Sequence, residues 1–338
     1  MVKKMNEELL EVNNLTTSFK IDGQYYQAID DLSINLKHDE VLAIVGESGC
    51  GKSTLATSII GLHDSNSTKM TGSITYKGKN ILNLPDKQMD DVRGNEIGMI
   101  FQDPLAALNP LMRIGDQIKE GLDIHTDLNE EQKQARVLEL LDQVGIPNPK
   151  RVAHQFPHQL SGGMRQRVII AIAIACKPEV IIADEPTTAL DVTIQAQILD
   201  LLHAIQDENH AGIILITHDL GVVAETADRV AVMYAGQIVE IGSVQQIFEN
   251  PKHPYTRSLL RSMPQVGDDD DLYVIDGMVP SLKQMPKTGC RFSSRVSWVD
   301  PESHEENPTM HEVEPGHSVR CTCYQTFKFK DEVKEGER

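Results

Sequence analysis

The chain of 338 residues carries a formal net charge of −18, and 40% of its residues are hydrophobic but only 4% are aromatic. This length predicts about two domains, or one large domain with additions, around a mainly aliphatic core. The acidic balance argues against non-specific binding to nucleic acid or to anionic lipid, because both are negatively charged themselves.

The sequence has no feature of export or of a membrane span. Residues 1–8 have no apolar run after their lysines, so they are not expected to form a signal peptide. The longest apolar run, residues 168–176, is far shorter than the roughly 20 residues of a membrane helix. Any membrane association is therefore expected to be peripheral. The odd number of cysteines, five, indicates free thiols in a reducing compartment.

Residues 9–45 are predicted to be rich in strands, because apolar and polar residues alternate on both sides of a turn at Gly23. The sequence allows two interpretations of Phe19. It is either an exposed ring that stacks on a nucleotide base, with Tyr25 or Tyr26 as the other candidates, or a core residue of a strand.

A glycine-rich loop follows the apolar residues 41–45 and precedes residues 54–60, which are compatible with a helix. The loop reads Gly46-Glu47-Ser48-Gly49-Cys50-Gly51-Lys52-Ser53, the G-x-x-x-x-G-K-S pattern of phosphate-binding loops. Its glycines let backbone N–H groups face phosphate oxygens, and the following helix adds the positive end of its dipole. Lys52 is expected to reach the β- and γ-phosphates, and the Ser53 hydroxyl to bind Mg²⁺.

Further strands are predicted to end in polar residues. Residues 97–101 end at Gln102, residues 180–183 at Asp184 and Glu185, and residues 212–217 at His218. Asp184 suits Mg²⁺, and Glu185 can polarise a water for attack on a γ-phosphate. His218 is either a γ-phosphate ligand or, taken alone, a structural histidine. Because the carboxyl ends of parallel strands form one edge of a sheet, these residues and the phosphate loop are expected to form a single site.

Residues 105–159 are predicted to be a helical insertion, because no strand pattern occurs there. Asn129 is expected to cap a helix, with Gln132 at the reciprocal position of a capping box. The insertion ends in the sequence Leu160-Ser161-Gly162-Gly163-Met164-Arg165-Gln166-Arg167. Ser161 is a good N-cap, and the two glycines expose backbone N–H groups, so this is either a second anion-binding surface or an ordinary helix start.

The order of these motifs resembles the ATPase subunit of ABC transporters over residues 9–265. The resemblance rests on the phosphate loop, Gln102, residues 160–167, Asp184-Glu185, Ala189-Leu190-Asp191 and His218. It implies an α/β fold: a phosphate-loop RecA-like core with an antiparallel β subdomain, a helical subdomain at about residues 103–178 and a small C-terminal extension. The ABC ATPase domain is then residues 1–265, and the extension is residues 266–338.

The resemblance also implies a role for each motif residue. The loop residues expected to bind ATP are Gly46, Glu47, Ser48, Gly49, Cys50, Gly51, Lys52, Ser53 and Thr54. Mg²⁺ is expected at Ser53, Gln102 and Asp184, and the catalytic residues are Glu185 as general base with His218 and Gln102. Ser161, Gly162 and Gly163 are expected to complete the ATP site of an opposite subunit, with Asp191 signalling across the interface and Phe19 stacking on adenine.

Two segments narrow the resemblance. Residues 101–110 and 250–260 are similar to segments of oligopeptide, dipeptide and nickel importers, and the whole chain is close to the oligopeptide-permease ATPase subunits of Gram-positive bacteria. This implies a peripheral subunit at the cytoplasmic face of the cell membrane that hydrolyses ATP to power oligopeptide import. Dipeptides and nickel stay open as cargo, because the ATPase never touches the cargo.

The resemblance implies several partners: a second homologous ATPase subunit, with a heterodimer preferred, two transmembrane permease subunits, and an extracellular solute-binding protein that acts through the permease. No nucleic acid is expected. An alternative of another class is a soluble ABC ATPase in DNA repair or translation. The sequence shows neither a coiled-coil insertion nor a second cassette, and its charge of −18 disfavours nucleic acid.

The C-terminal residues are predicted from composition and cysteine spacing. Residues 268–271 are expected to be a solvated acidic linker, and residues 272–282 a strand with turns. Many peptide-importer ATPases have a four-cysteine pattern associated with an iron–sulfur cluster. Cys290, Cys321 and Cys323 match its ends, whereas Val296 and Ser303 occupy its middle positions. Three thiolates are one fewer than a cluster normally uses, so the sequence disfavours a bound cluster or zinc ion.

Overall fold

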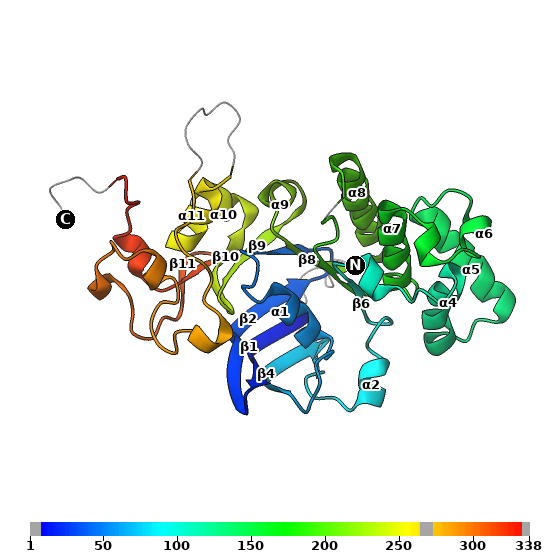
Figure 1. Cartoon of the computed structure of the whole chain (residues 1–338), viewed down its shortest axis with the longest axis horizontal. Coiled ribbons are helices and arrows are strands. Elements are labelled where there is room, and N and C mark those ends of the chain that lie inside the picture. The colour runs from blue at the N-terminus through cyan, green and yellow to red at the C-terminus, as the bar shows by residue number, and fades with distance from the viewer. Residues whose placement is uncertain (1–7, 189, 264–272, 333–338) are drawn as a thin grey trace.

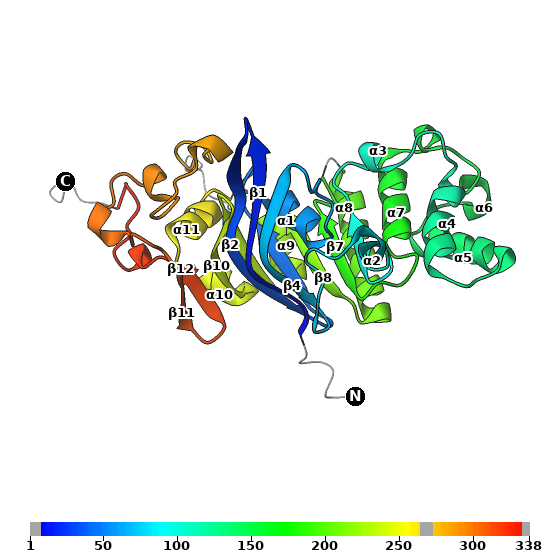
Figure 2. The same cartoon turned by 90° about the horizontal axis from the view of Figure 1, so that it is seen from below.

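The computed structural model describes residues 8–188, 190–263 and 273–332. Two sheets form its centre, with a group of helices at one end and the C-terminal elements at the other (Figure 1, Figure 2). Two sequence-based predictions concern residues outside the described ranges: that the N-terminus, residues 1–7, is no signal peptide, and that residues 268–271 form an acidic linker. None of the described helices combines the length and the apolar character needed to cross a membrane.

The smaller sheet is antiparallel and has the strand order β2-β1-β4-β5. Its strands are β1 (Glu8–Ile21), β2 (Gln24–Lys37), β4 (Thr68–Tyr76) and β5 (Lys79–Asn80). The predicted strand-rich opening and its turn at Gly23 are confirmed, and Gly23 has a φ of +81°. The buried face of this sheet, including Leu10 and Leu15, packs against the second sheet.

The larger sheet has the strand order β11-β12-β10-β9-β3-β8-β7-β6. Its strands are β3 (Val41–Val45), β6 (Ile97–Ile100), β7 (Val180–Asp184), β8 (Gly212–Thr217), β9 (Arg229–Tyr234), β10 (Gln237–Ser243), β11 (Met310–Glu314) and β12 (His317–Arg320). Strands β9, β3, β8, β7 and β6 run parallel, whereas β10, β12 and β11 are antiparallel to their neighbours. Every residue of β3, β7 and β8 is buried, which explains their continuous apolar sequences.

Helices flank the larger sheet and fill the predicted insertion between β6 and β7. They are α1 (Lys52–Ile59), α2 (Asp86–Asp90), α3 (Pro104–Ala107), α4 (Ile114–His125), α5 (Glu130–Gln143), α6 (Pro149–Val152), α7 (Gly162–Ala173), α8 (Val192–Asn209), α9 (Leu220–Thr226), α10 (Val244–Glu249) and α11 (Pro254–Arg261). Asn129 and Gln132 form the predicted capping box at α5. The helical insertion is thus confirmed, and its apolar residues, such as Ile118 and Leu140, belong to one core with residues of the larger sheet such as Ile181.

The C-terminal segment attaches to the larger sheet through β12, which pairs with β10. The predicted strand at residues 272–282 is wrong, because the described residues 273–281 form no strand. The guanidinium of Arg295 instead donates hydrogen bonds to the carbonyl oxygens of Ile275, Asp276 and Gly277. These carbonyl groups are therefore satisfied by a side chain and not by a neighbouring strand.

Candidate functional site

Four parallel strands bring the predicted polar residues to one edge of the larger sheet. The register pairs Ile100 of β6 with Ala183 of β7, Asp184 with Ile216 of β8, and Thr217 with Val45 of β3. The residues that follow these strand ends, namely Gln102, Glu185, His218 and Gly46, consequently lie at the same edge. The predicted shared edge is confirmed by this register.

The phosphate loop runs from the end of β3 into α1. Only glycine fits at position 46, because a Cβ there would lie 2.1 Å from the backbone oxygen of Met233. Gly51 has a φ of +109°, a conformation that side chains with a Cβ rarely adopt. The loop folds around Lys52, whose buried ammonium donates to the carbonyl oxygens of Gly46 at 2.7 Å and Glu47 at 3.1 Å. No side chain caps α1, so the N–H groups of its first turn are available to an anion bound at the loop.

A cavity of about 260 Å³ lies between the phosphate loop and the smaller sheet. Its lining includes Phe19, Lys52, Ser53, Gln102 and Glu185, which are all residues predicted to contact ATP or its Mg²⁺. The phosphate loop and two of the strand-end residues, Gln102 and Glu185, are therefore brought together around one cavity, whereas Asp184 and His218 do not line it.

The aromatic candidates differ in position. Phe19 is half-buried, lines the cavity, and contacts His63 edge-on with ring centroids 5.2 Å apart. Tyr25 and Tyr26 line a separate cavity of about 480 Å³. Phe19 belongs to none of the buried apolar clusters of the described residues, so its position favours the base-stacking interpretation over the core one.

Glu185 is the centre of the polar contacts at the sheet edge. Its Oε2 accepts hydrogen bonds from Gln102 Nε2 and Thr188 Oγ1, each at 2.8 Å, and lies 3.4 Å from His218 Nδ1. Its own N–H donates to the carbonyl oxygen of Ile216 at 2.9 Å. The sequence analysis did not identify Thr188, although a hydroxyl group in the turn just after the predicted catalytic carboxylate is a usable signal.

Asp184 is only 4% exposed, and its Oδ1 has no hydrogen-bond partner among the described residues. Burial raises the pKa of its carboxyl, and the Ser53 hydroxyl opposes this shift through a hydrogen bond. A carboxylate oxygen without a partner next to a serine hydroxyl matches the oxygen ligands that Mg²⁺ takes in proteins. The residues present therefore fit the predicted metal ion.

The predicted signature residues lie elsewhere. Ser161 caps α7 by accepting from the Met164 N–H at 3.3 Å, and Asp191 caps α8 by accepting from the Ile194 N–H at 2.9 Å. Ser161 and Gly162 are exposed, and neither lines the cavity of the phosphate loop. Figure 1 shows α7 and α8 side by side and apart from α1. The chain thus presents a free helix start that its own nucleotide cavity does not use.

Two loop residues turn away from the cavity. The Glu47 carboxylate is held by Arg295, with Nη1 and Oε2 2.6 Å apart, and the Glu47 N–H donates to the Tyr255 hydroxyl at 2.8 Å. Cys50 is 1% exposed and packs among apolar residues between the sheets. Its burial raises the pKa of its thiol. Neither Glu47 nor Cys50 lines the cavity, although both were predicted to bind ATP.

The C-terminal extension also reaches the cavity, which the sequence-based interpretation missed. Leu282 and Met285 line it opposite the phosphate loop. Arg295 lies 248 residues after Glu47, so no local pattern signals their pairing.

The three C-terminal cysteines are buried, free, and close together. The assignment of Val296 and Ser303 as the middle positions of the pattern missed the fourth member of the group. Val296 packs in the apolar core, and the residue after Ser303, His304, joins the cysteines. A motif counted in cysteines alone overlooks a histidine that lies beside the three cysteines.

Comparisons with known proteins decide the family. A model described as "ABC transporter" matches residues 29–188, and one described as "Oligopeptide/dipeptide transporter, C-terminal region" matches residues 239–300. The oligopeptide transport ATP-binding protein OppD of Lactococcus lactis subsp. cremoris (strain SK11) is 56% identical over 333 residues, which cover 98% of each chain. The chain belongs to the ABC transporter ATPases. The resemblance inferred from the motifs is confirmed.

Other similar proteins agree with this family. The oligopeptide transport ATP-binding protein OppD of Bacillus subtilis (strain 168) is 50% identical over 92% of this chain and 88% of its own length. Among solved structures, the ATP-binding cassette MJ0796, described as a dimer in a post-hydrolysis state bound to ADP and Pi, is 29% identical with a TM-score of 0.63. That match covers 70% of this chain and 98% of the cassette, which confirms the predicted phosphate-loop α/β fold. The domain division at residue 265 stays a prediction.

Proposed function

We propose that this ABC ATPase is the ATP-binding and hydrolysing subunit of an importer that powers uptake of oligopeptides across the cytoplasmic membrane. The observation that carries the ATPase role is the position of Glu185, which lies beside the phosphate-loop cavity and contacts Gln102 and His218. The peptide cargo is supported by the relatives, two of which are named oligopeptide transport ATP-binding proteins.

ATP binds with its phosphates in the phosphate loop. The N–H groups at the start of α1 and the Lys52 ammonium neutralise the phosphate charge. Gly49 and Gly51 line the cavity without side chains, and Ser53 and Thr54 offer hydroxyl groups at the cavity wall. Phe19 stacks on the adenine. Ser53, Asp184 and Gln102 would hold Mg²⁺, which would spread the negative charge of the phosphates.

Hydrolysis depends on Glu185 as general base. Its carboxylate orients a water molecule toward the γ-phosphate and accepts a proton from it. The contacts of Glu185 with Gln102 and Thr188 fix the direction of the carboxylate. His218 contacts the γ-phosphate and helps to align Glu185. These residues follow the ends of neighbouring strands of one sheet, and the register of the strands holds them at the same edge.

The exposed start of α7 belongs to the ATP site of an opposite ATPase subunit. Ser161, Gly162 and Gly163 close over the partner's ATP, and Asp191 senses the interface. Two ATP molecules then hold two subunits together, and hydrolysis lets them separate. A heterodimer with a homologous ATPase is preferred, attached to two transmembrane permease subunits at the cytoplasmic face of the membrane, with a solute-binding protein acting through the permease.

The mechanism is tested by Glu185→Gln. This variant should keep ATP binding, lose turnover by about 10²-fold or more because its general base is absent, and accumulate as an ATP-bound dimer. Glu225→Gln, at an exposed position of α9, should keep wild-type turnover. Steady-state hydrolysis at the wild-type rate by Glu185→Gln would refute the assigned role.

The cargo and partners require a separate experiment. We expect affinity purification of the full chain from solubilised membranes to recover a second ATPase and two permease subunits. Recovery of the chain without any membrane protein would favour the alternative of a soluble ABC ATPase. Uptake of labelled oligopeptide, dipeptide and nickel by cells lacking this chain then separates the three cargoes, since only the true cargo loses ATP-dependent uptake.

A further inference from the structure

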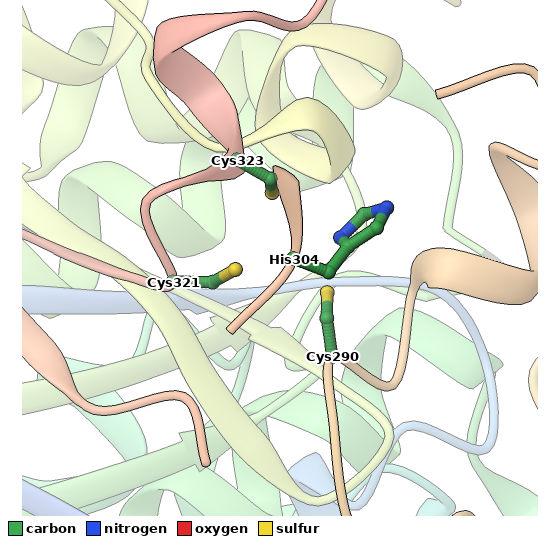
Figure 3. Close-up of side chains that lie close together, drawn as sticks. All are labelled: Cys290, His304, Cys321 and Cys323. Atoms are coloured by element: carbon green, nitrogen blue, oxygen red, sulfur yellow. The ribbon is translucent and has the colours of Figure 1, made fainter. Parts of the chain in front are cut away.

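The C-terminal extension contains a compact group of metal-binding side chains, Cys290, His304, Cys321 and Cys323. Their sulfur atoms and one imidazole nitrogen all lie within 4.8 Å of one another. In Figure 3 the three sulfur atoms and the imidazole ring face a common centre. Cys321 and Cys323 are at most 1% exposed and Cys290 is 7% exposed, whereas His304 is half-buried, so the three sulfur atoms lie inside the protein with the imidazole at their side.

His304 Nδ1 is the observation that points to a missing ligand. This nitrogen is buried and has no hydrogen-bond partner among the described residues. Buried polar atoms in folded proteins nearly always have a partner, and a bound ion satisfies a ring nitrogen as well as a hydrogen bond does. The imidazole therefore lies next to three thiol groups with one nitrogen available for coordination.

The backbone around Cys321 favours the same interpretation. Cys321 has a φ of +70°, in the left-handed region that residues with a Cβ seldom adopt. This conformation follows directly after β12 and turns the chain so that both Cys321 and Cys323 point inward (Figure 3). The N–H of Glu305 donates to Cys321 Sγ at 3.5 Å, a contact that favours the thiolate form needed for a metal ligand.

The separations distinguish a single ion from a cluster. Around a tetrahedral Zn²⁺, sulfur and nitrogen ligands at about 2.3 and 2.0 Å from the metal stand roughly 3.5–4 Å apart. A group confined to 4.8 Å closes to that size with small side-chain movements. An iron–sulfur cluster contains several metal and sulfide ions, so its ligands stand further apart than those of a single ion. This site also offers three thiolates, one fewer than such a cluster normally uses.

We propose that Cys290, His304, Cys321 and Cys323 bind one structural Zn²⁺ ion in tetrahedral geometry. Three thiolates and one imidazole form a complete ligand set of a structural zinc site, which leaves no position open for catalysis. The ion joins three loop segments of the extension that contain little regular secondary structure.

The ion also supports the phosphate loop. Arg295, which holds Glu47 of that loop, lies in the segment between the ligands Cys290 and His304. Phe292 in the same segment packs against Tyr234 of β9 and Tyr255 of α11. Zinc at the two ends of this segment restricts its movement, and thereby keeps Arg295 at the loop.

The proposal is tested on the full-length protein, purified anaerobically without added metal. We expect elemental analysis to find one zinc per chain. After chelation, Co²⁺ should bind with the intense visible absorption of a tetrahedral thiolate site. Stoichiometric iron with acid-labile sulfide would overturn the proposal, as would metal-free protein that takes up neither Zn²⁺ nor Co²⁺ under reducing conditions.

Variants assign the ligands. His304→Ala and Cys321→Ser should lose most of the bound zinc, whereas the matched controls His154→Ala and Cys176→Ser, which lie outside the group, should retain it. His304→Cys keeps four ligands and should retain zinc. Full zinc in His304→Ala would contradict the assignment. If that variant does not fold, the zinc content and cobalt spectrum of the wild type still decide whether the site exists.

Discussion

At the scale of single residues, the neighbouring carboxylates of Asp184 and Glu185 have different surroundings because their backbone conformations differ. Asp184 is the last residue of β7, and one of its oxygens is buried without a partner. Glu185 has a left-handed φ of +45°, which turns its side chain toward Gln102 and His218. The two carboxylates thus lie in different surroundings, which is the arrangement expected if Asp184 binds a metal ion and Glu185 a water molecule.

His63 illustrates how local packing changes a titration. Its Nε2 is in hydrogen-bond contact with Ser58 Oγ at 3.0 Å and Thr57 Oγ1 at 3.2 Å, and its ring contacts Phe19. Burial lowers the pKa of the His63 imidazole, and the backbone of Thr54 opposes the shift. The neutral ring is therefore favoured in the folded protein, next to the residue proposed to stack on adenine.

We predict that His63 makes the protein sensitive to mild acid. Because the pKa of His63 is lower in the folded state, the unfolded chain binds the proton more readily, and stability falls as the pH drops from about 6.5 toward that lowered pKa. Urea denaturation between pH 7.5 and 5.5 should show a steeper loss of stability for wild type than for His63→Gln. Parallel pH profiles of the two proteins would contradict this prediction.

At the scale of elements, the C-terminal extension acts as a brace for the loop between β3 and α1. The Arg295 side chain is 3% exposed, and its guanidinium makes two contacts with the Glu47 carboxylate, at 2.6 and 3.2 Å. The Tyr255 hydroxyl at the start of α11 accepts from the N–H of the same glutamate. Two segments that follow the ATPase motifs in the sequence thus hold Glu47 of the phosphate loop.

We predict that Arg295→Ala destabilises the protein by about 3 kcal/mol, the cost of breaking a largely buried ion pair, and weakens ATP binding. Lys283→Ala is the control, because the Lys283–Asp22 pair is exposed on both sides. It should cost less than about 1 kcal/mol and leave ATP affinity unchanged. Urea denaturation and a nucleotide titration measure both quantities, and equal effects of the two variants would show that the brace is absent.

At the scale of the whole molecule, the phosphate loop lies apart from the start of α7, which we propose to complete the ATP site of a second subunit. The phosphate loop and Glu185 surround one cavity, whereas Ser161 and Gly162 are exposed at α7 and do not line it. An ATP site completed by a second subunit accounts for this separation. It also makes the identity of that subunit testable by mixing variants.

We predict that co-expressed Glu185→Gln and Ser161→Arg forms do not restore uptake in cells that lack the wild-type chain. If the chain paired with itself, a mixed pair would contain one intact ATP site. If it pairs with a different ATPase, no complex contains both variants. Peptide uptake measures the outcome, with wild type co-expressed with each variant as the positive control. Clear recovery by the mixed pair would contradict the preferred heterodimer.

The local motifs were predictable from the sequence because their physics is local. The phosphate loop needs its glycines for backbone conformation, and Asn129 and Ser161 cap the helices that begin beside them. Continuous apolar runs predicted the buried strands β3, β7 and β8, and parallel strands place their carboxyl ends together. These interactions span a few residues or follow from the sheet itself.

The sequence by itself thus determined the ATPase core and the residues at its sheet edge. Only the tertiary structure decided what the C-terminal extension does: Arg295 reaches Glu47, Leu282 and Met285 line the nucleotide cavity, and His304 joins the cysteines. The prediction of a strand at residues 272–282 was wrong for a similar reason. Three carbonyl groups there accept hydrogen bonds from the distant Arg295 side chain and not from a neighbouring strand. Such contacts join segments far apart in the chain, and they depend on packing in three dimensions that no periodicity of the sequence records.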